Sequence, residues 1–367
     1  MNSIYSRDTS IEPISLAPIE LCQKGVSSVN EILLEKLKDR LEGKCNTRGL
    51  IKDNSIEMLS RSCASLYATN FKGDLHFNVK IAYRDYGPDD AEPILLVHGL
   101  GAQLVHWPDH LINFLIENNY RPITFDNRDA GLSSRFSAKP SFTLDYLKYY
   151  LRLPMSSEYT LKDMSKDAIA VLNTLDIKKA HIFGTSMGGM IAQIICSMFA
   201  DRVKSFTLVA STASVPGPFN GPTREVQDVM LQRSKMTNPT LEDVYQREIK
   251  WVSLIGMEGR DLETDEFREE VIANYNRAKD KADGYGYARQ LLAILASKNR
   301  IKRVKAIKAP TLIIHGEQDP IINVKNAYKM KKLIPQSKLK IIPNMRHLIE
   351  EEILDQFKED LLTHLKQ

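Results

Sequence analysis

A serine lies between two glycines in the segment Gly184 to Gly188, which follows an apolar run and precedes a helical pattern. In a G-x-S-x-G arrangement of this kind the chain makes a sharp strand-to-helix turn, and small neighbours avoid a collision. The turn would lift the Ser186 hydroxyl above the end of a sheet. The N-terminus of the next helix would offer N–H groups to a developing negative charge. We therefore predict that Ser186 is a nucleophile.

A second glycine-rich segment, residues 98–102, directly follows the apolar run that begins at Pro93. Glycines allow the backbone to approach a bound carbonyl group closely. The N–H group of Leu100, paired with that of Met187, would form an oxyanion hole for such a group. The residues expected to contact the substrate are Gly99, Gly101 and Trp107.

The acid and the base that such a serine needs are expected further along the chain, in the order serine, acid, histidine. Asp319 follows the apolar run at residues 311–314, where an orienting carboxylate belongs, and Glu317 in the same loop is the alternative acid. His347 follows the next predicted strand. Its neutral imidazole would take the Ser186 proton and return it to the leaving group.

Apolar runs and helical patterns alternate from about Tyr83 to the end of the chain. Continuous apolar runs are typical of strands buried on both faces, and their alternation with helices predicts an α/β fold. We expect a mostly parallel central sheet with helices on both faces. The strands predicted from such runs are residues 93–98, 122–126, 180–184, 205–209 and 311–315. A sixth strand is predicted at residues 338–342, which alternate like an edge strand.

The alternation is interrupted between about residues 216 and 305, which begin with prolines and glycines and contain helical patterns but no convincing strand. We interpret this segment as a helical cap over one end of the sheet. The predicted organisation is an N-terminal extension (1–75), the first part of the core (76–215), the cap (216–305) and the second part of the core (306–367).

The composition is that of an ordinary globular protein, with 43% hydrophobic and 26% charged residues among 367. A net charge of +4 is too small to predict nucleic-acid binding. The longest apolar run is far shorter than the ~20 residues of a membrane-spanning helix, and the first residues lack the pattern of a secretory signal. The four cysteines and eight histidines show no metal-ligand spacing. We expect a cytoplasmic protein with no metal and no membrane partner.

Several motifs together resemble one family. They are His98-Gly99-Leu100-Gly101 with Trp107-Pro108, Phe125–Ser133, Gly184–Gly189, Arg289–Ile294 and His315–Pro320. On these residues the chain resembles the α/β-hydrolase superfamily from about Lys80 to Gln367, and it is most similar to the esterase branch that includes aclacinomycin methylesterase-like proteins. The resemblance implies a serine hydrolase that cleaves small-molecule carboxylic esters without a cofactor, beneath a helical cap that forms the acyl or alcohol pocket. It also implies that Arg128 holds loops by hydrogen bonds and is not catalytic.

Two features depart from that pattern. Arg346 precedes His347, where the family usually has glycine, and residues 1–75 are not part of the usual hydrolase pattern. Thioesterase, lactonase and carbon–carbon bond hydrolase chemistry remain alternatives because the same triad performs them. A non-catalytic binding protein on this scaffold is an alternative of another class. The sequence predicts no particular oligomeric state.

Overall fold

The computed structural model describes residues 66–72, 77–217, 221–235, 239–278, 284–297 and 300–367. All of them lie in Ile56–Gln367, one of the two units into which the chain divides. Most of the predicted N-terminal extension, residues 1–65, is outside the described part. No helix among the described residues is long and apolar enough to cross a membrane.

The described residues form an eight-stranded sheet with the order β1-β2-β4-β3-β5-β6-β7-β8. The strands are β1 (Leu66–Lys72), β2 (Phe77–Asp85), β3 (Glu92–Val97), β4 (Tyr120–Phe125), β5 (Ala180–Thr185), β6 (Val203–Val209), β7 (Thr311–Gly316) and β8 (Lys338–Ile342). The pairs β1–β2 and β2–β4 are antiparallel, and every other pair is parallel. The six predicted strands correspond to β3–β8, so the predicted α/β class with a mostly parallel sheet is confirmed.

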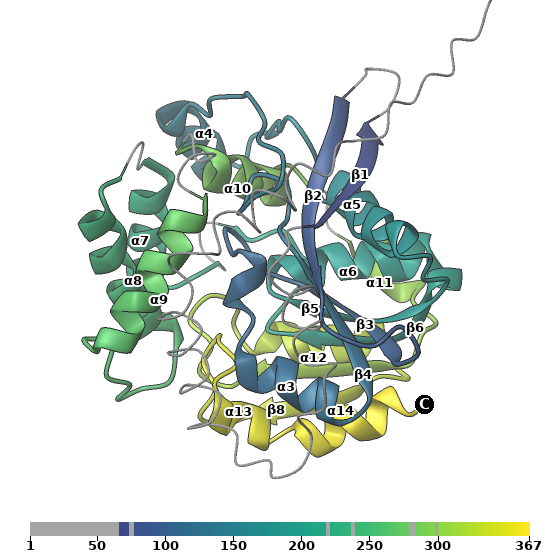
Figure 1. Ribbon diagram of the computed structural model, residues 1–367. Coiled ribbons are helices and arrows are strands. Elements are labelled where there is room, and N and C mark those ends of the chain that lie inside the picture. The colour runs from purple at the N-terminus through teal and green to yellow at the C-terminus, as the bar shows by residue number, and fades with distance from the viewer. Residues whose placement is uncertain (1–65, 73–76, 218–220, 236–238, 279–283, 298–299) are drawn as a thin grey trace, which may run out of the picture. The chain divides into compact units, whose positions relative to one another are not determined.

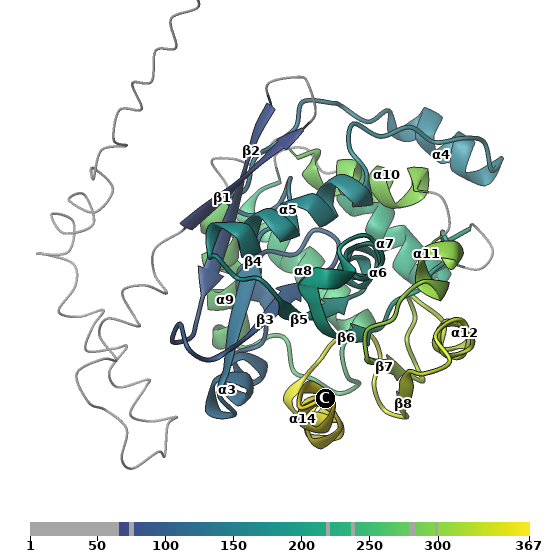
Figure 2. The ribbon, with the colours of Figure 1, turned by 90° about the vertical axis from the view of Figure 1, so that its right-hand side faces the viewer.

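Helices cover both faces of this sheet (Figures 1 and 2). One face carries α5 (Leu161–Thr174), α6 (Met187–Met198), α11 (Ile301–Lys305) and α12 (Lys325–Leu333), and the other carries α3 (Asp109–Glu117), α13 (Glu351–Asp355) and α14 (Lys358–Leu365). The connections β3–α3–β4 and β5–α6–β6 are the crossovers that parallel strands require.

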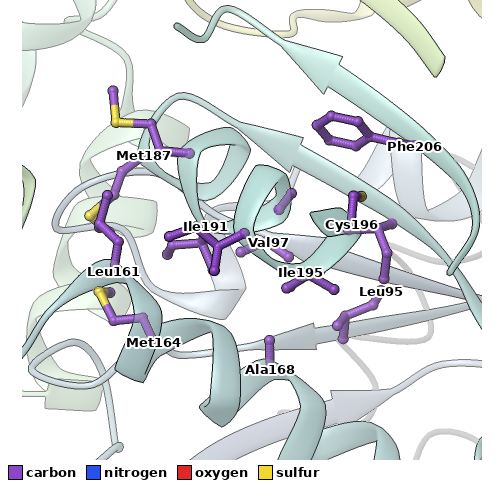
Figure 3. Close-up of a cluster of buried hydrophobic side chains, with 14 of the residues drawn as sticks. Leu95, Val97, Leu161, Met164, Ala168, Met187, Ile191, Ile195, Cys196 and Phe206 are labelled. Atoms are coloured by element: carbon purple, nitrogen blue, oxygen red, sulfur yellow. The ribbon is translucent and has the colours of Figure 1, made fainter. Parts of the chain in front are cut away.

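The alternation of side chains along β3 explains why a continuous apolar run is needed there. Leu95 and Val97 belong to the hydrophobic cluster on one face, whereas Ile94 and Leu96 belong to the cluster on the other face. All four are fully buried. Figure 3 shows Leu95 and Val97 beside labelled side chains of α5 and α6. A strand with helices on both faces has no solvent side, so it contains no alternating polar residues.

The N-terminus of α5 is formed by a capping box. The Thr160 hydroxyl accepts a hydrogen bond from the Asp163 N–H (3.3 Å), and the Asp163 carboxylate accepts one from the Thr160 N–H (2.9 Å). Two N–H groups that the helix cannot satisfy itself therefore have partners. This fixes the start of a helix whose buried face packs on β1, β2 and α6.

Between β6 and β7 the described chain contains helices and no strand, as predicted. The helices are α7 (Arg224–Lys235), α8 (Leu241–Ile255), α9 (Asp265–Ala278) and α10 (Gly286–Ala296), followed by α11. Five side chains of α8, α9 and the segment between them form a small separate hydrophobic cluster: Val244, Tyr245, Leu262, Phe267 and Val271. Figure 1 shows α7, α8 and α9 grouped beside the sheet. The domain boundaries at 75, 215 and 305 stay predictions.

Arg128 is fully buried after β4 and forms two hydrogen bonds with Asp167 of α5, at 2.6 and 2.7 Å. The rings of Phe136 and Tyr159 each lie 5.0 Å from its guanidinium carbon. Asp167 thus compensates a positive charge that has almost no contact with solvent.

We expect Asp167→Ala to lower the free energy of unfolding by about 3–5 kcal/mol, because it leaves the Arg128 charge buried without a carboxylate. Urea denaturation of the full chain measures this. Asp360→Ala is the matched control, since the Asp360–Lys340 ion pair is largely exposed and its loss should be small. Equal losses in the two variants would contradict this account of Arg128.

A buried histidine should make stability depend on pH. His364 of α14 is 1% exposed and donates from Nε2 to the Phe206 carbonyl (3.1 Å), and burial lowers its pKa to about 4. The unfolded chain takes up a proton at this residue near pH 6.5, whereas the folded chain does not until the pH approaches 4. Stability therefore falls as the pH is lowered through this window.

We expect the unfolding free energy to decline between about pH 6.5 and about pH 5, and we expect His364→Gln to remove roughly 1–2 kcal/mol of that decline. Chemical denaturation of both proteins at several pH values in this range tests the expectation. Parallel curves for the wild type and the variant would show that His364 is not responsible.

Candidate active site

Ser186 occupies the predicted turn between β5 and α6, and its backbone is strained there. Its φ is 54° and its ψ is −121°, a region that residues other than glycine rarely adopt. Hydrogen bonds hold both of its peptide groups: its N–H donates to Val209 O (3.0 Å), and its carbonyl accepts from the Ser211 hydroxyl (2.8 Å). Both partners are at or beyond the end of β6. The sheet itself therefore holds Ser186 in this conformation.

The glycines around Ser186 are required by close packing. A Cβ atom on Gly188 would lie 1.9 Å from the carbonyl oxygen of Val97, and one on Gly184 would lie 2.7 Å from Gly188 O. The first turn of α6 therefore lies directly against the end of β3. No side chain larger than hydrogen fits at residue 188 without moving a central strand.

The predicted acid and base are hydrogen-bonded to each other. His347 Nδ1 donates to Asp319 Oδ2 at 2.7 Å, and both residues are buried. Asp319 Oδ1 accepts from the N–H groups of Ile321 (2.8 Å) and Ile322 (2.9 Å), which fixes the carboxylate. Because Nδ1 carries the proton toward Asp319, Nε2 is left as the basic nitrogen. Glu317, the alternative acid, is exposed to solvent.

The three predicted triad residues lie at one edge of the sheet. Ser186 follows β5, Asp319 follows β7 and His347 follows β8, each beyond the carboxyl end of a parallel strand. This is the edge at which α/β proteins place their sites. The His347 N–H donates to Ile255 O (2.8 Å), so the end of α8 helps to hold the histidine loop.

The loop after β3 lies against Ser186, as an oxyanion loop must. A Cβ atom on Gly99 would lie 3.3 Å from Ser186 Cβ and 3.7 Å from its Oγ. The N–H groups on both sides of Leu100 have acceptors, since Gly99 donates to His98 Nδ1 (2.7 Å) and Gly101 donates to Gln290 Oε1 (2.8 Å). The N–H of Leu100 itself has no acceptor within the described part of the chain.

The Met187 N–H is similarly available, because it belongs to the first residue of α6 and the helix contains no acceptor for it. The two N–H groups proposed for the oxyanion hole thus come from a loop and a helix start that contact each other through Gly99 and Ser186. Their role in binding an oxyanion stays a prediction.

His98 is a neutral neighbour of this site. Burial, followed by the nearby His106 and more weakly His347, lowers the pKa of His98 to about 3. Its ring packs on Trp107 with 4.5 Å between centroids, and its Nδ1 accepts from the Gly99 N–H. His98 therefore orients the loop and carries no charge near neutral pH.

Two of the three residues expected to contact the substrate lie against other groups of the protein. Gly101 lies against the cap, where an added Cβ would be 2.7 Å from the Tyr287 ring and 3.1 Å from Arg233. Trp107 is 4% exposed and packs on His98 and Phe183. Its Nε1 has no hydrogen-bond partner among the described residues. Of the three, Gly99 is the one in contact with Ser186.

The side chains by which the cap holds this loop were not predicted from the sequence. Gln290 of α10 accepts from Gly101 N and donates to Arg128 O (2.6 Å). Arg277 of α9 donates to the Gln103 side-chain oxygen (2.7 Å) and to Asp126 (2.8 Å). Gln290 lies in a motif used only for the family resemblance. Since its partner is 189 residues away, no local pattern could assign this contact.

Arg346, which stands where the family usually has glycine, contacts the cap. Its guanidinium donates to Ser253 O (3.0 Å) and to Glu258 (3.2 Å).

Among the described residues, no group of three or more histidine, cysteine and acidic side chains could hold a metal ion.

The packing of Gly188 generates a prediction with a definite sign. In a helix, alanine is normally favoured over glycine by about 0.5–1 kcal/mol. We expect Gly188→Ala instead to destabilise the protein by about 2 kcal/mol or more, because its Cβ collides with β3. Urea denaturation measures the change, with Ser197→Ala at the other end of α6 as the control. A stabilised Gly188→Ala variant would disprove the close contact.

Comparisons with known proteins agree with this architecture. A family model described as the alpha/beta hydrolase fold matches residues 92–352. The chain is 25% identical over 299 residues to a non-heme chloroperoxidase from Burkholderia pyrrocinia, with 79% of this chain and 97% of the relative covered. It is 24% identical over 297 residues to the rhodomycin D methylesterase DauP from Streptomyces sp. (strain C5), with 76% and 92% covered.

Among solved structures, a thermophilic esterase from Thermogutta terrifontis is similar in fold. Its TM-score is 0.61 at 20% identity, and the match covers 83% of this chain and all of that one. The two curated relatives are covered almost completely by this chain, so the similarity extends over whole proteins of that kind.

Proposed function

The chain belongs to the alpha/beta hydrolase fold family, and from that membership we propose that it is a serine hydrolase that cleaves carboxylic esters through an acyl-enzyme. One observation carries the proposal. Ser186 has a strained backbone, and it lies at the same edge of the sheet as Asp319 and His347, which are hydrogen-bonded to each other. Strain at one residue that the surrounding packing preserves is a feature of functional sites.

In the proposed first half-reaction, Ser186 Oγ attacks the ester carbonyl carbon while His347 Nε2 takes the hydroxyl proton. Asp319 holds Nδ1–H and stabilises the imidazolium that forms. The carbonyl oxygen becomes an oxyanion and is received by the N–H groups of Leu100 and Met187. The tetrahedral intermediate then expels the alcohol, which takes its proton from His347.

In the second half-reaction, His347 removes a proton from water, and the resulting nucleophile attacks the acyl carbonyl. The second tetrahedral intermediate then breaks its bond to Ser186 Oγ, which takes the proton from His347, and the carboxylic acid is released. The methylesterase relative supports an ester as the substrate. The chloroperoxidase relative is named for another activity, so the choice of a small-molecule ester as the substrate is our proposal.

We expect a fluorophosphonate probe to add once to the wild type and not to Ser186→Ala, as read by intact mass. With p-nitrophenyl esters, Ser186→Ala and His347→Ala should fall to the background rate, a loss of roughly 10⁶-fold. Asp319→Asn should lose roughly 10⁴-fold, because the nucleophile and the oxyanion donors remain.

Two control variants make this test specific. Ser197→Ala removes another α6 hydroxyl and should label and turn over like the wild type, and Glu317→Ala removes the exposed alternative acid without effect. An adduct that persists in Ser186→Ala would mean that another residue is the nucleophile. An inactive Glu317→Ala beside an active Asp319→Asn would reverse the choice of acid.

A further inference from the structure

One surface of the protein is apolar and exposed without any role in the chemistry proposed above. Six large hydrophobic side chains are exposed in the described part of the chain, and five of them lie on α4 (Phe142–Tyr150) or just after it. They are Leu144, Leu147, Tyr150, Leu151 and Leu153. Single exposed apolar residues are ordinary, but a cluster of this kind marks an interaction surface.

Three of these leucines form a stripe on one face of the helix. Leu144, Leu147 and Leu151 recur at i, i+3 and i+7 and are 50%, 53% and 59% exposed. Residues at this spacing lie above one another on a helix. In Figures 1 and 2, α4 lies at the periphery beyond α10, away from the sheet. The stripe is therefore presented to solvent and contributes little to the core.

The charged residues of this segment of the sequence are mostly positive. Residues 139–153 contain the cations Lys139, Lys148 and Arg152 and a single acid, Asp145. Lys148 stands one helical turn from Leu144, and Tyr150 lies on the other flank of the stripe. Long basic side chains and tyrosine beside an apolar face are typical of helices at a lipid–water boundary, where the apolar stem is buried and the polar end stays wet.

We propose that α4 and residues 151–153 bind the surface of a bilayer that contains anionic lipids. The leucines would enter the boundary between headgroups and acyl chains, and Lys139 and Lys148 would face the lipid phosphates and carboxylates. A helix of nine residues cannot span a bilayer, so the contact is peripheral. The expectation of no membrane partner rested on apolar runs too short to span a bilayer and on the missing secretory signal, and neither observation bears on peripheral binding.

The size of the stripe favours lipid over a second copy of the chain. Nine helical residues extend over about 14 Å, and a helix is about 10 Å wide. The resulting face is several times smaller than the roughly 800 Å² per partner that stable protein interfaces bury. A few inserted leucines with basic neighbours are enough for reversible adhesion to an anionic surface.

Sedimentation of the full-length chain with vesicles tests the proposal. We expect the wild type to pellet with phosphatidylcholine–phosphatidylserine vesicles and to pellet much less with pure phosphatidylcholine. The triple variant Leu144→Ser/Leu147→Ser/Leu151→Ser should bind at least about tenfold more weakly. The double variant Lys139→Glu/Lys148→Glu should bind the anionic vesicles at least about tenfold more weakly, with no change on pure phosphatidylcholine. Added salt should likewise weaken the binding of the wild type to the anionic vesicles.

The matched control is Tyr328→Ser on α12, which removes the sixth of the exposed large apolar side chains found among the described residues and should bind like the wild type. Since the substituted leucines, Lys139 and Tyr328 are exposed and Lys148 is half-buried, unfolding midpoints should change little. A wild type that stays in the supernatant with both vesicles would overturn the proposal. Binding of the triple leucine variant to the vesicles as strong as that of the wild type would also overturn it. So would a wild type that is a dimer in ultracentrifugation while the leucine variant is a monomer.

Discussion

The contact between the first turn of α6 and the end of β3 determines the geometry of the whole site. Gly188 lies so close to Val97 that only a hydrogen atom fits between them. That approach requires the chain to reverse within the single residue Ser186, whose positive φ is the result. The same contact brings the loop after β3 onto Ser186, because Val97 is the last residue of the strand and Gly99 follows it. One packing constraint thus positions the proposed nucleophile and the proposed oxyanion donors together.

The sheet supplies the rest of the site by its order. With β5, β6, β7 and β8 as parallel neighbours, the loops after β5, β7 and β8 emerge at one edge. Asp319 needs no contact with Ser186, since its carboxylate is fixed by the N–H groups of its own loop and by His347. The strands therefore set the distances between the loops, and local hydrogen bonds set the orientation of each side chain.

Much of this could be predicted from the sequence, because the signals are local. The strands β3–β7 are recognised by apolar runs, β8 by the alternation of an edge strand, and Ser186 by the glycines around it. What the sequence could not show are contacts between distant segments. Gly101 is bound by Gln290 of the cap, and Arg346 is turned toward Ser253 and Glu258. Trp107 is buried beside His98. Each depends on the folded arrangement of elements that no short motif encodes.

The loop after β4 connects the cap to the core through buried ion pairs. Its three charged residues each bind a partner from a different helix: Asp126 binds Arg277 of α9, Arg128 binds Asp167 of α5, and Asp129 binds Arg289 of α10. Buried ion pairs contribute little net stability, but separating them leaves uncompensated charges out of water. Lifting the cap would expose two buried carboxylates and also break the Gln290 hydrogen bond to Gly101. The position of the cap and the shape of the loop beside Ser186 are therefore coupled.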